Sequence, residues 1–170
     1  MYVGTANVFG YGSLTQPGTE EQPYTSYQYG LDYMDSKRAA TDHVLAAART
    51  GFPAVLVHPT FMLGAWATKR TSGALLAELA ERRVPGYPPG GKNYVHVADV
   101  AVATVNALTM GCVGESYILG HENLSYQAAF RLMAEVLKIA PPQLPLPSLL
   151  VRLYGQLSEW KAFMTGVLVP

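Results

Sequence analysis

The sequence of 170 residues has one cysteine, no excess of either charge and no long hydrophobic run, and each absence excludes a class of protein. Cys112 has no partner for an internal disulfide, which fits a reducing, cytoplasmic location. Twelve Lys and Arg residues balance twelve Asp and Glu residues, so no basic stripe indicates a nucleic-acid partner. No stretch reaches about 18 consecutive apolar residues, so we expect no membrane span. The four histidines are scattered, so no metal site is expected.

Two further signals are missing near the start of the sequence. Residues 1–4 have neither the basic segment nor the long apolar run of a secretory signal, which also favours a cytoplasmic location. No Gly-x-Gly-x-x-Gly pattern follows an opening strand, so the turn that cradles a dinucleotide phosphate is not expected here.

The residues that are present predict an α/β fold with a parallel sheet. Hydrophobic residues make up 49% of the chain and charged residues 14%, which is typical of a globular domain with a core. Strands alternate with helices along the sequence, as in a parallel sheet with flanking helices. The expected strands are 1–9, 54–58, 93–97 and 116–119, and the expected helices are 32–49, 73–82, 100–110, 125–138 and an apolar stripe from Ser148 to Met164. We expect Asp99 to be the N-cap of the helix 100–110.

Tyr33 and Lys37 form the strongest candidate for chemistry. They are four residues apart in the helix 32–49, so their side chains lie one turn apart on the same face. A phenol has a reference pKa of about 10, and a neighbouring cation favours the phenolate. Such a pair can donate and accept a proton for a carbonyl or an alcohol. By itself the spacing is equally compatible with a surface lysine beside a half-buried tyrosine.

Four segments in the same order resemble the extended short-chain dehydrogenase/reductase superfamily, and a fifth extends the similarity. This superfamily includes NAD-dependent sugar epimerases and dehydratases, dihydroflavonol-4-reductase-like enzymes and 3β-hydroxysteroid dehydrogenases. The matching segments are VGTANVFG at 3–10, YMDSK at 33–37, AVLVHPTFMLG at 54–64, NYVHVADVA at 93–101 and YILGHENLSYQAAF at 117–130.

The resemblance implies roles for individual residues. Tyr33 would be the general acid and base, and Lys37 would hold the ribose hydroxyls of NAD or NADP and favour the phenolate of Tyr33. Thr5 would donate a hydrogen bond to the substrate oxygen. The segment Pro59, Thr60 and Phe61 would lie near the nicotinamide. The sequence departs from the family pattern at Gly4, where many members have a second Ser or Thr, and at His58, where arginine is commoner.

The resemblance also implies a fold and a function. The fold would be an incomplete Rossmann-like parallel sheet with flanking helices and a small substrate-side C-terminal region. Residues 1–60 would be the second half of the Rossmann-like domain and residues 61–170 the substrate-side region interleaved with the remaining sheet elements, with the glycine-rich cofactor half absent.

The implied function is part of an NAD(P)-dependent oxidoreductase that transfers a hydride at a hydroxyl or carbonyl carbon of a small molecule. The dihydroflavonol reductase or 3β-hydroxysteroid dehydrogenase type is preferred. A nucleotide-sugar epimerase or dehydratase is one alternative, and an inactive fragment or binding module without the cofactor site is another. A homodimer through the helix of Tyr33 and Lys37 is also expected.

Overall fold

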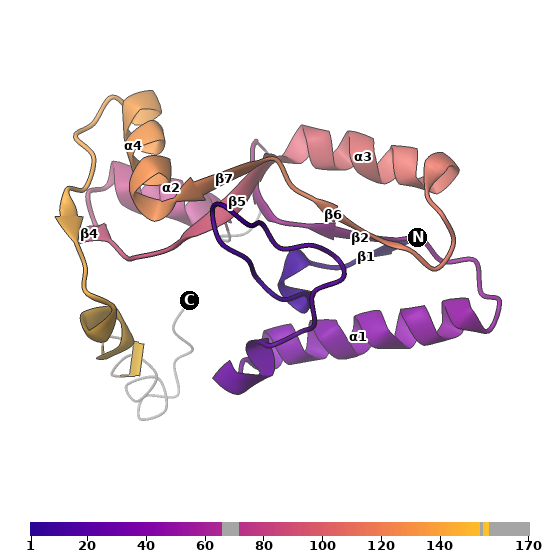
Figure 1. Cartoon of the computed structure of the whole chain (residues 1–170). Coiled ribbons are helices and arrows are strands. Elements are labelled where there is room, and N and C mark those ends of the chain that lie inside the picture. Colours follow the sequence, from indigo (N-terminus) through magenta and orange to yellow (C-terminus); the bar gives the residue numbers. More distant parts are fainter. Residues whose placement is uncertain (66–71, 154, 157–170) are drawn as a thin grey trace, which may run out of the picture. The chain divides into compact units, whose positions relative to one another are not determined.

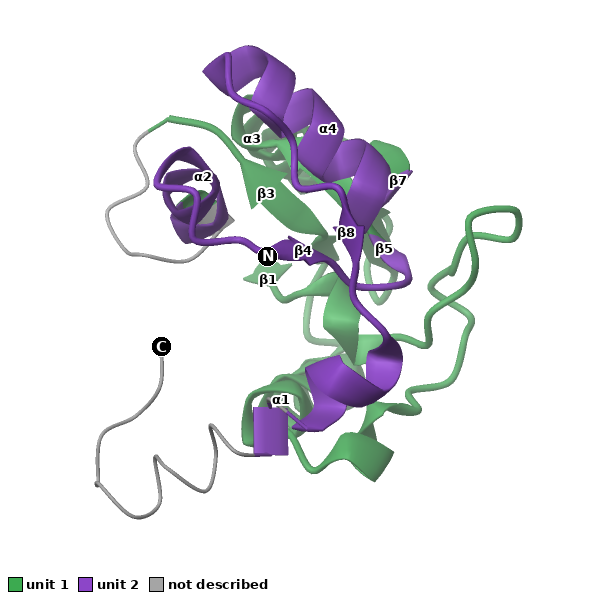
Figure 2. Cartoon of the chain, turned by 90° about the vertical axis from the view of Figure 1, so that its left-hand side faces the viewer, with its two compact units in different colours: residues 1–73, 92–123 green, residues 74–91, 124–170 purple. Residues whose placement is uncertain are grey.

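The computed structural model describes residues 1–65, 72–153 and 155–156, so Leu157, Trp160 and Met164 of the C-terminal apolar stripe lie outside the described residues. The chain divides into two compact units (Figure 2). The first unit contains residues 1–73 and 92–123, and the second contains residues 74–91 and 124–170. We describe each unit by itself.

A parallel three-stranded sheet forms the centre of the first unit. Its order is β1 (Tyr2–Val3), β2 (Leu56–Pro59) and β6 (Ser116–Leu119). Every residue of β2 is buried, which fits the apolar run at residues 54–57 before the buried His58. The helices α1 (Asp32–Arg49) and α3 (Val97–Met110) lie on opposite faces of this sheet (Figure 1). The predicted Rossmann-like α/β architecture with flanking helices is therefore confirmed.

The two edges of this sheet differ. At the β6 edge, the loop between residues 10 and 25 reaches the strand, and the carboxylate of Glu20 accepts a hydrogen bond of 2.6 Å from the backbone N–H of Ile118. At the opposite edge, β1 pairs only with β2 among the described residues.

The structure corrects two local predictions. Strand β1 ends at Val3, and a 3-10 turn, η1 (Ala6–Val8), replaces the rest of the predicted strand 1–9. The predicted N-cap Asp99 is wrong, because α3 begins at Val97 and Asp99 lies in its first turn. His96, the last residue of β5, is the N-cap, and its Nδ1 accepts a 3.2 Å hydrogen bond from the backbone N–H of Ala98.

A second three-stranded sheet has the order β3 (Phe61–Leu63), β5 (Gly91–His96) and β7 (Glu122–Ser125), with β3 and β5 parallel. Within the second unit, β4 (Gly86–Tyr87) pairs in parallel with β8 (Leu144–Pro145). The helix α4 (Tyr126–Leu137) packs against β4 and buries Phe130 and Met133. The helix α2 (Ser72–Ala80) precedes β4 in the chain.

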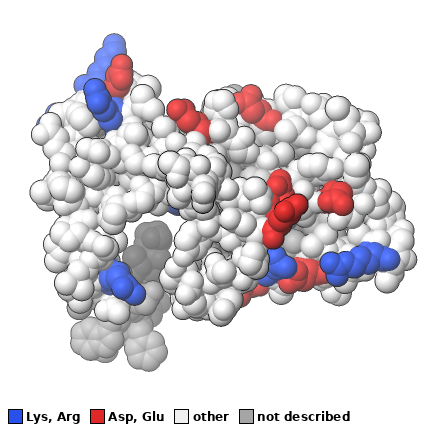
Figure 3. Space-filling view, viewed as in Figure 1, with Lys and Arg blue, Asp and Glu red and all other residues white. Residues whose placement is uncertain are grey.

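None of the described helices combines the length and the apolar character that crossing a membrane requires. The described ranges also contain no group of three or more His, Cys, Asp or Glu residues placed to hold a metal ion. On the face drawn in Figure 3, charged side chains lie in small separate groups with wide uncharged areas between them.

Candidate functional site

Tyr33 and Lys37 lie side by side at the start of α1. The Nζ atom of Lys37 is 6.0 Å from the centroid of the Tyr33 ring, at the outer limit of a cation–π contact. The Tyr33 side chain is 58% exposed, so its hydroxyl is accessible from solvent. The structure therefore gives this pair the proximity that the helical spacing predicts.

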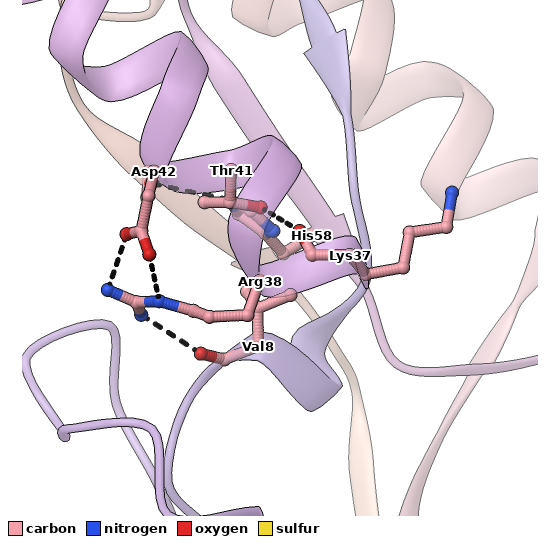
Figure 4. A network of polar contacts seen from close by, with 7 residues as sticks. Val8, Lys37, Arg38, Thr41, Asp42 and His58 are labelled. Carbon is pink, nitrogen blue, oxygen red and sulfur yellow. Dashed lines mark hydrogen bonds and ion pairs between the residues drawn. The ribbon is translucent and has the colours of Figure 1, made fainter. Parts of the chain in front are cut away.

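A polar contact of α1 fixes this helix to the turn that follows Thr5 (Figure 4). The Nη1 atom of Arg38 donates a 3.1 Å hydrogen bond to the carbonyl of Val8, and its Nη2 atom is 2.7 Å from Asp42. The buried hydroxyl of Thr41 donates to the carbonyl of Lys37 at 3.0 Å. Figure 4 shows the Lys37 side chain pointing away from the Arg38–Asp42 pair. These contacts leave the ammonium of Lys37 available for a ligand.

Thr5 lies just beyond the carboxyl end of β1, where it caps η1. Its Oγ1 accepts a 3.4 Å hydrogen bond from the backbone N–H of Asn7, which leaves the hydroxyl proton free to donate elsewhere. Because η1 packs against α1, the turn that Thr5 caps and the helix of Tyr33 and Lys37 meet at one end of the sheet. In open parallel sheets, ligands bind outside the carboxyl ends of the strands.

A hollow of about 220 Å³ lies beside this junction. Tyr11 and Tyr29 close one part of it, with their hydroxyl oxygens 2.8 Å apart. The hydrogen bond to Tyr29 raises the pKa of Tyr11, so the Tyr11 phenol is neutral at physiological pH. Among the described residues no charged side chain lines the hollow, whose walls are Ala6, Asn7, Phe9, Gly10, Tyr11, Ser26, Tyr29 and Met34. Tyr11 and Tyr29 were not predicted as site residues from their sequence context, which is a loop rich in Gly, Pro and Tyr at residues 11–30.

Pro59, Thr60 and Phe61 lie at the carboxyl end of β2, next to the end of β1. The hydroxyl of Thr60 donates a 2.8 Å hydrogen bond to Oδ1 of Asn93. The same oxygen accepts a 3.0 Å hydrogen bond from the backbone N–H of His121. Thr60 is thus held by hydrogen bonds, and Pro59, Thr60 and Phe61 lie at the same end of the sheet as Thr5.

Lys92 is a second cation of this region that the sequence analysis did not select. Its Nζ atom is 4.7 Å from the centroid of the Phe61 ring, and burial lowers the pKa of Lys92. Within the described residues, Lys92 has no ion pair with a carboxylate.

His58 is completely buried in β2 rather than exposed to a ligand. Its Nε2 atom lies 3.3 Å from the hydroxyl of Ser116, and its ring meets the Phe9 ring edge to face at 4.8 Å. Burial lowers the pKa of His58, so the imidazole is neutral at physiological pH. This residue therefore lies in the core of the first unit, behind the segment that carries Thr5.

Comparisons with known proteins show the family and the fold of the chain. Residues 1–120 match the sequence model of the NAD dependent epimerase/dehydratase family. A putative dihydroflavonol 4-reductase from Synechocystis is 31% identical over 140 residues, which cover 76% of this chain and 41% of that protein. Sterol demethylase protein B from Methylococcus capsulatus is 23% identical over 147 residues, which cover 85% of this chain and 45% of that protein.

Solved structures extend the comparison. A nucleoside-diphosphate-sugar epimerase from Pseudomonas aeruginosa superposes with a TM-score of 0.82 at 28% identity, over 93% of this chain and 52% of that chain. The dTDP-glucose 4,6-dehydratase from Bacillus anthracis, solved in complex with NAD, gives a TM-score of 0.69 at 21% identity, over 85% of this chain and 48% of that chain. The chain thus spans less than half the length of the two curated relatives. These matches confirm the predicted superfamily and its fold.

Proposed function

The chain belongs to the NAD dependent epimerase/dehydratase family, and on that premise we propose that it carries the substrate-side catalytic part of an NAD(P)-dependent oxidoreductase. The reaction is hydride transfer at a hydroxyl or carbonyl carbon of a small molecule. The observation that carries the proposal is the meeting of the Tyr33–Lys37 pair and the Thr5 turn at the carboxyl end of a parallel sheet. In this proposal residues 1–60 supply the acid–base chemistry, and residues 61–170 supply most of the substrate side.

Each residue has a defined task in the reaction. When bound, NAD or NADP supplies the hydride acceptor or donor. The Tyr33 phenolate takes the proton of a substrate alcohol during oxidation and returns it to the oxygen during reduction. The Lys37 ammonium favours the phenolate and donates to the ribose hydroxyls. The free proton of the Thr5 hydroxyl holds the substrate oxygen, while Pro59, Thr60 and Phe61 form the wall beside the nicotinamide.

The Tyr33–Lys37 pair is compatible with the binding of a nicotinamide nucleoside. Lys37 has no carboxylate partner in the described part of the chain, so its ammonium can donate to a diol without breaking an ion pair. The accessible hydroxyl of Tyr33 lies on the same helix face, one turn away.

The uncharged hollow supports a substrate of the dihydroflavonol or 3β-hydroxysteroid type. Its lining offers tyrosine hydroxyls and an asparagine amide but no cation to balance a phosphate. A cyclic hydroxy or keto compound without charge matches such a lining.

A nucleotide-sugar epimerase or dehydratase is the second candidate, and Lys92 favours it. An ammonium with no acidic partner, held against Phe61, can receive a diphosphate. The similarity to the epimerase from Pseudomonas aeruginosa supports the same candidate.

We also propose a homodimer through α1. Ala39, Ala40 and Ala46 are exposed on this helix, and such small side chains would allow the same helix of a second copy to approach closely. Sedimentation of the protein with Ala40→Arg is the test, because a dimer through α1 would dissociate.

Kinetics of the full-length protein test the function. Tyr33→Phe should reduce turnover by about 10²- to 10⁴-fold and leave cofactor affinity unchanged, because only the proton-transferring hydroxyl is lost. Tyr27→Phe is the matched control, since Tyr27 is also exposed, at 68% against 58% for Tyr33, and lies outside the pair. Keto and hydroxy compounds without charge, tested beside nucleotide sugars, decide between the two substrate classes. Wild-type turnover by Tyr33→Phe would refute the assignment, and no turnover of any substrate by the wild-type protein would favour an inactive binding module.

A further inference from the structure

The two positions at which the sequence departs from the family pattern, Gly4 and His58, contact each other. We propose that His58 is a positioning residue for Thr5, and that its imidazole, buried against the Gly4 backbone, fixes the place of the Thr5 hydroxyl. This inference rests on the proposed function, in which Thr5 holds the substrate oxygen.

The first support is the enclosure of the His58 ring by the segment that carries Thr5. The ring lies edge to face with Phe9, at 4.8 Å and 76°, and with Tyr2, at 6.4 Å and 61°. Tyr2 lies in β1, before Thr5, and Phe9 follows the turn that Thr5 caps. The residues on both sides of Thr5 therefore pack on one imidazole, and that imidazole is 0% exposed.

The second support is the close approach at Gly4. A Cβ atom at this position would lie 2.6 Å from Nδ1 and 2.9 Å from Cε1 of His58, so only glycine leaves room for the ring. The backbone N–H of Gly4 donates a 2.8 Å hydrogen bond to the carbonyl of Val57, which holds the two strands in this register. Gly4 and His58 thus pack as a complementary pair, because the absence of a side chain at Gly4 makes room for the His58 ring.

The third support is the hydrogen bonding of the ring. Nε2 lies 3.3 Å from the Ser116 hydroxyl, whereas Nδ1 is buried and has no hydrogen-bond partner among the described residues. An interaction with the backbone of Thr5 opposes the lowering of the His58 pKa by burial. A backbone polar group of Thr5 therefore lies beside the imidazole ring. If Ser116 donates to Nε2, the neutral ring carries its proton on Nδ1, on the side that faces Gly4.

This arrangement predicts a selective kinetic effect. A change at His58 moves the Thr5 hydroxyl, whereas the Tyr33–Lys37 pair keeps its spacing because both residues belong to the single helix α1. Misplacement of a catalytic group by about 1 Å can cost on the order of 10²-fold in rate. The loss should therefore appear in kcat, with cofactor affinity unchanged.

Three variants of the full-length protein test the inference. His58→Asn keeps an amide donor near the Nδ1 position, and His58→Gln places the amide near Nε2 instead. Val57→Ala is the control, because Val57 is the neighbouring residue of β2, equally buried, with its side chain on the other face of the sheet. We expect His58→Asn to retain most of the wild-type kcat and His58→Gln to lose about 10- to 100-fold. Val57→Ala should lower Tm with little effect on kcat.

A double-mutant cycle with Thr5→Ala shows whether the effect passes through Thr5. In the Thr5→Ala background, His58→Gln should cause almost no further loss of kcat. Independent, multiplying losses would overturn the positioning role. If Thr5→Ala alone kept wild-type turnover, the proposed catalytic role of Thr5 would fail instead.

Nuclear magnetic resonance of the wild-type protein gives a readout that needs neither turnover nor a folded variant. Ring ¹⁵N shifts should show the neutral Nδ1–H tautomer of His58, and an Nε2–H tautomer would overturn the inference. Where His58→Gln folds, it should shift the Thr5 methyl and amide signals more than Val57→Ala does. Equal shifts would also count against the inference.

Discussion

Gly4→Ala tests the packing beneath the candidate site in the most direct way. Gly4 does not have a left-handed backbone conformation, so alanine meets no backbone strain there, and the effect is purely steric. The new Cβ would lie 2.6 Å from Nδ1 of His58 and 3.0 Å from Cε1 of Tyr2. The His58 ring cannot yield easily, because Phe9 and Ser116 hold it from other sides.

The magnitude follows from two opposing effects. Extra methyl groups in a packed core typically cost about 1–3 kcal/mol. Replacing glycine by alanine restricts the unfolded chain and returns about 0.4–1 kcal/mol. We therefore expect a net destabilisation of roughly 1–2 kcal/mol. For a protein of this size, that free energy corresponds to a decrease in Tm of about 2–8 °C.

The assay is thermal and urea unfolding, followed by circular dichroism, of Gly4→Ala beside Gly155→Ala. A Cβ at Gly155 meets nothing within 4 Å, so this control should be neutral or stabilised. His58→Ser, which shortens the opposing side chain, should remove most of the cost of Gly4→Ala in a double-mutant cycle. If Gly4→Ala were as stable as the control, or if the two changes were additive, the close approach described here would be wrong.

Three further outcomes are expected. His96→Ala removes the acceptor at the start of α3 and should cost about 0.5–2 kcal/mol in the free energy of unfolding. Burial lowers the pKa of His58, with Glu20 opposing and Arg38 reinforcing the shift. The unfolded state then binds more protons than the folded state, so the contribution of His58 to the free energy of unfolding is complete above the unfolded pKa of about 6.5 and decreases as the pH falls through that value. Urea unfolding at several pH values should show that the free energy of unfolding depends less steeply on pH in His58→Asn than in the wild-type protein. Lys37→Ala should weaken cofactor binding and turnover together, which cofactor titration and kinetics of one preparation can measure.

The sheet and the main helix of the site were predictable from the sequence. Residues 54–57 form an apolar run because β2 is the central strand of a parallel sheet with both faces covered. The helix predicted at 32–49 is observed at the same residues, because alanine-rich composition and the stop at Thr50–Gly51 are local signals. The proximity of Tyr33 and Lys37 follows from helix geometry alone.

The support of the site was not predictable, because it depends on contacts between distant segments. Nothing local to Gly4 indicates that an imidazole 54 positions later occupies the space of its missing side chain. The cap of α3 depends on where β5 ends, and this is decided by pairing with β3 rather than by the sequence around Asp99. The hydroxyl contact between Tyr11 and Tyr29 closes a long loop whose path has no periodic signal.

The hydrogen bond from Ile118 to Glu20 makes the two edges of the central sheet unequal in their capacity to pair with a further strand. An unpaired strand edge is a template for further strands, and a carboxylate that occupies an outward N–H removes one rung of that template. The β6 edge is blunted in this way, whereas the outer side of β1 keeps its backbone groups open among the described residues. We therefore expect a further strand to pair with β1 more readily than with β6. We expect self-association by edge pairing to occur at β1 rather than at β6. Glu20→Ala would free the backbone N–H of Ile118 and allow pairing at both edges.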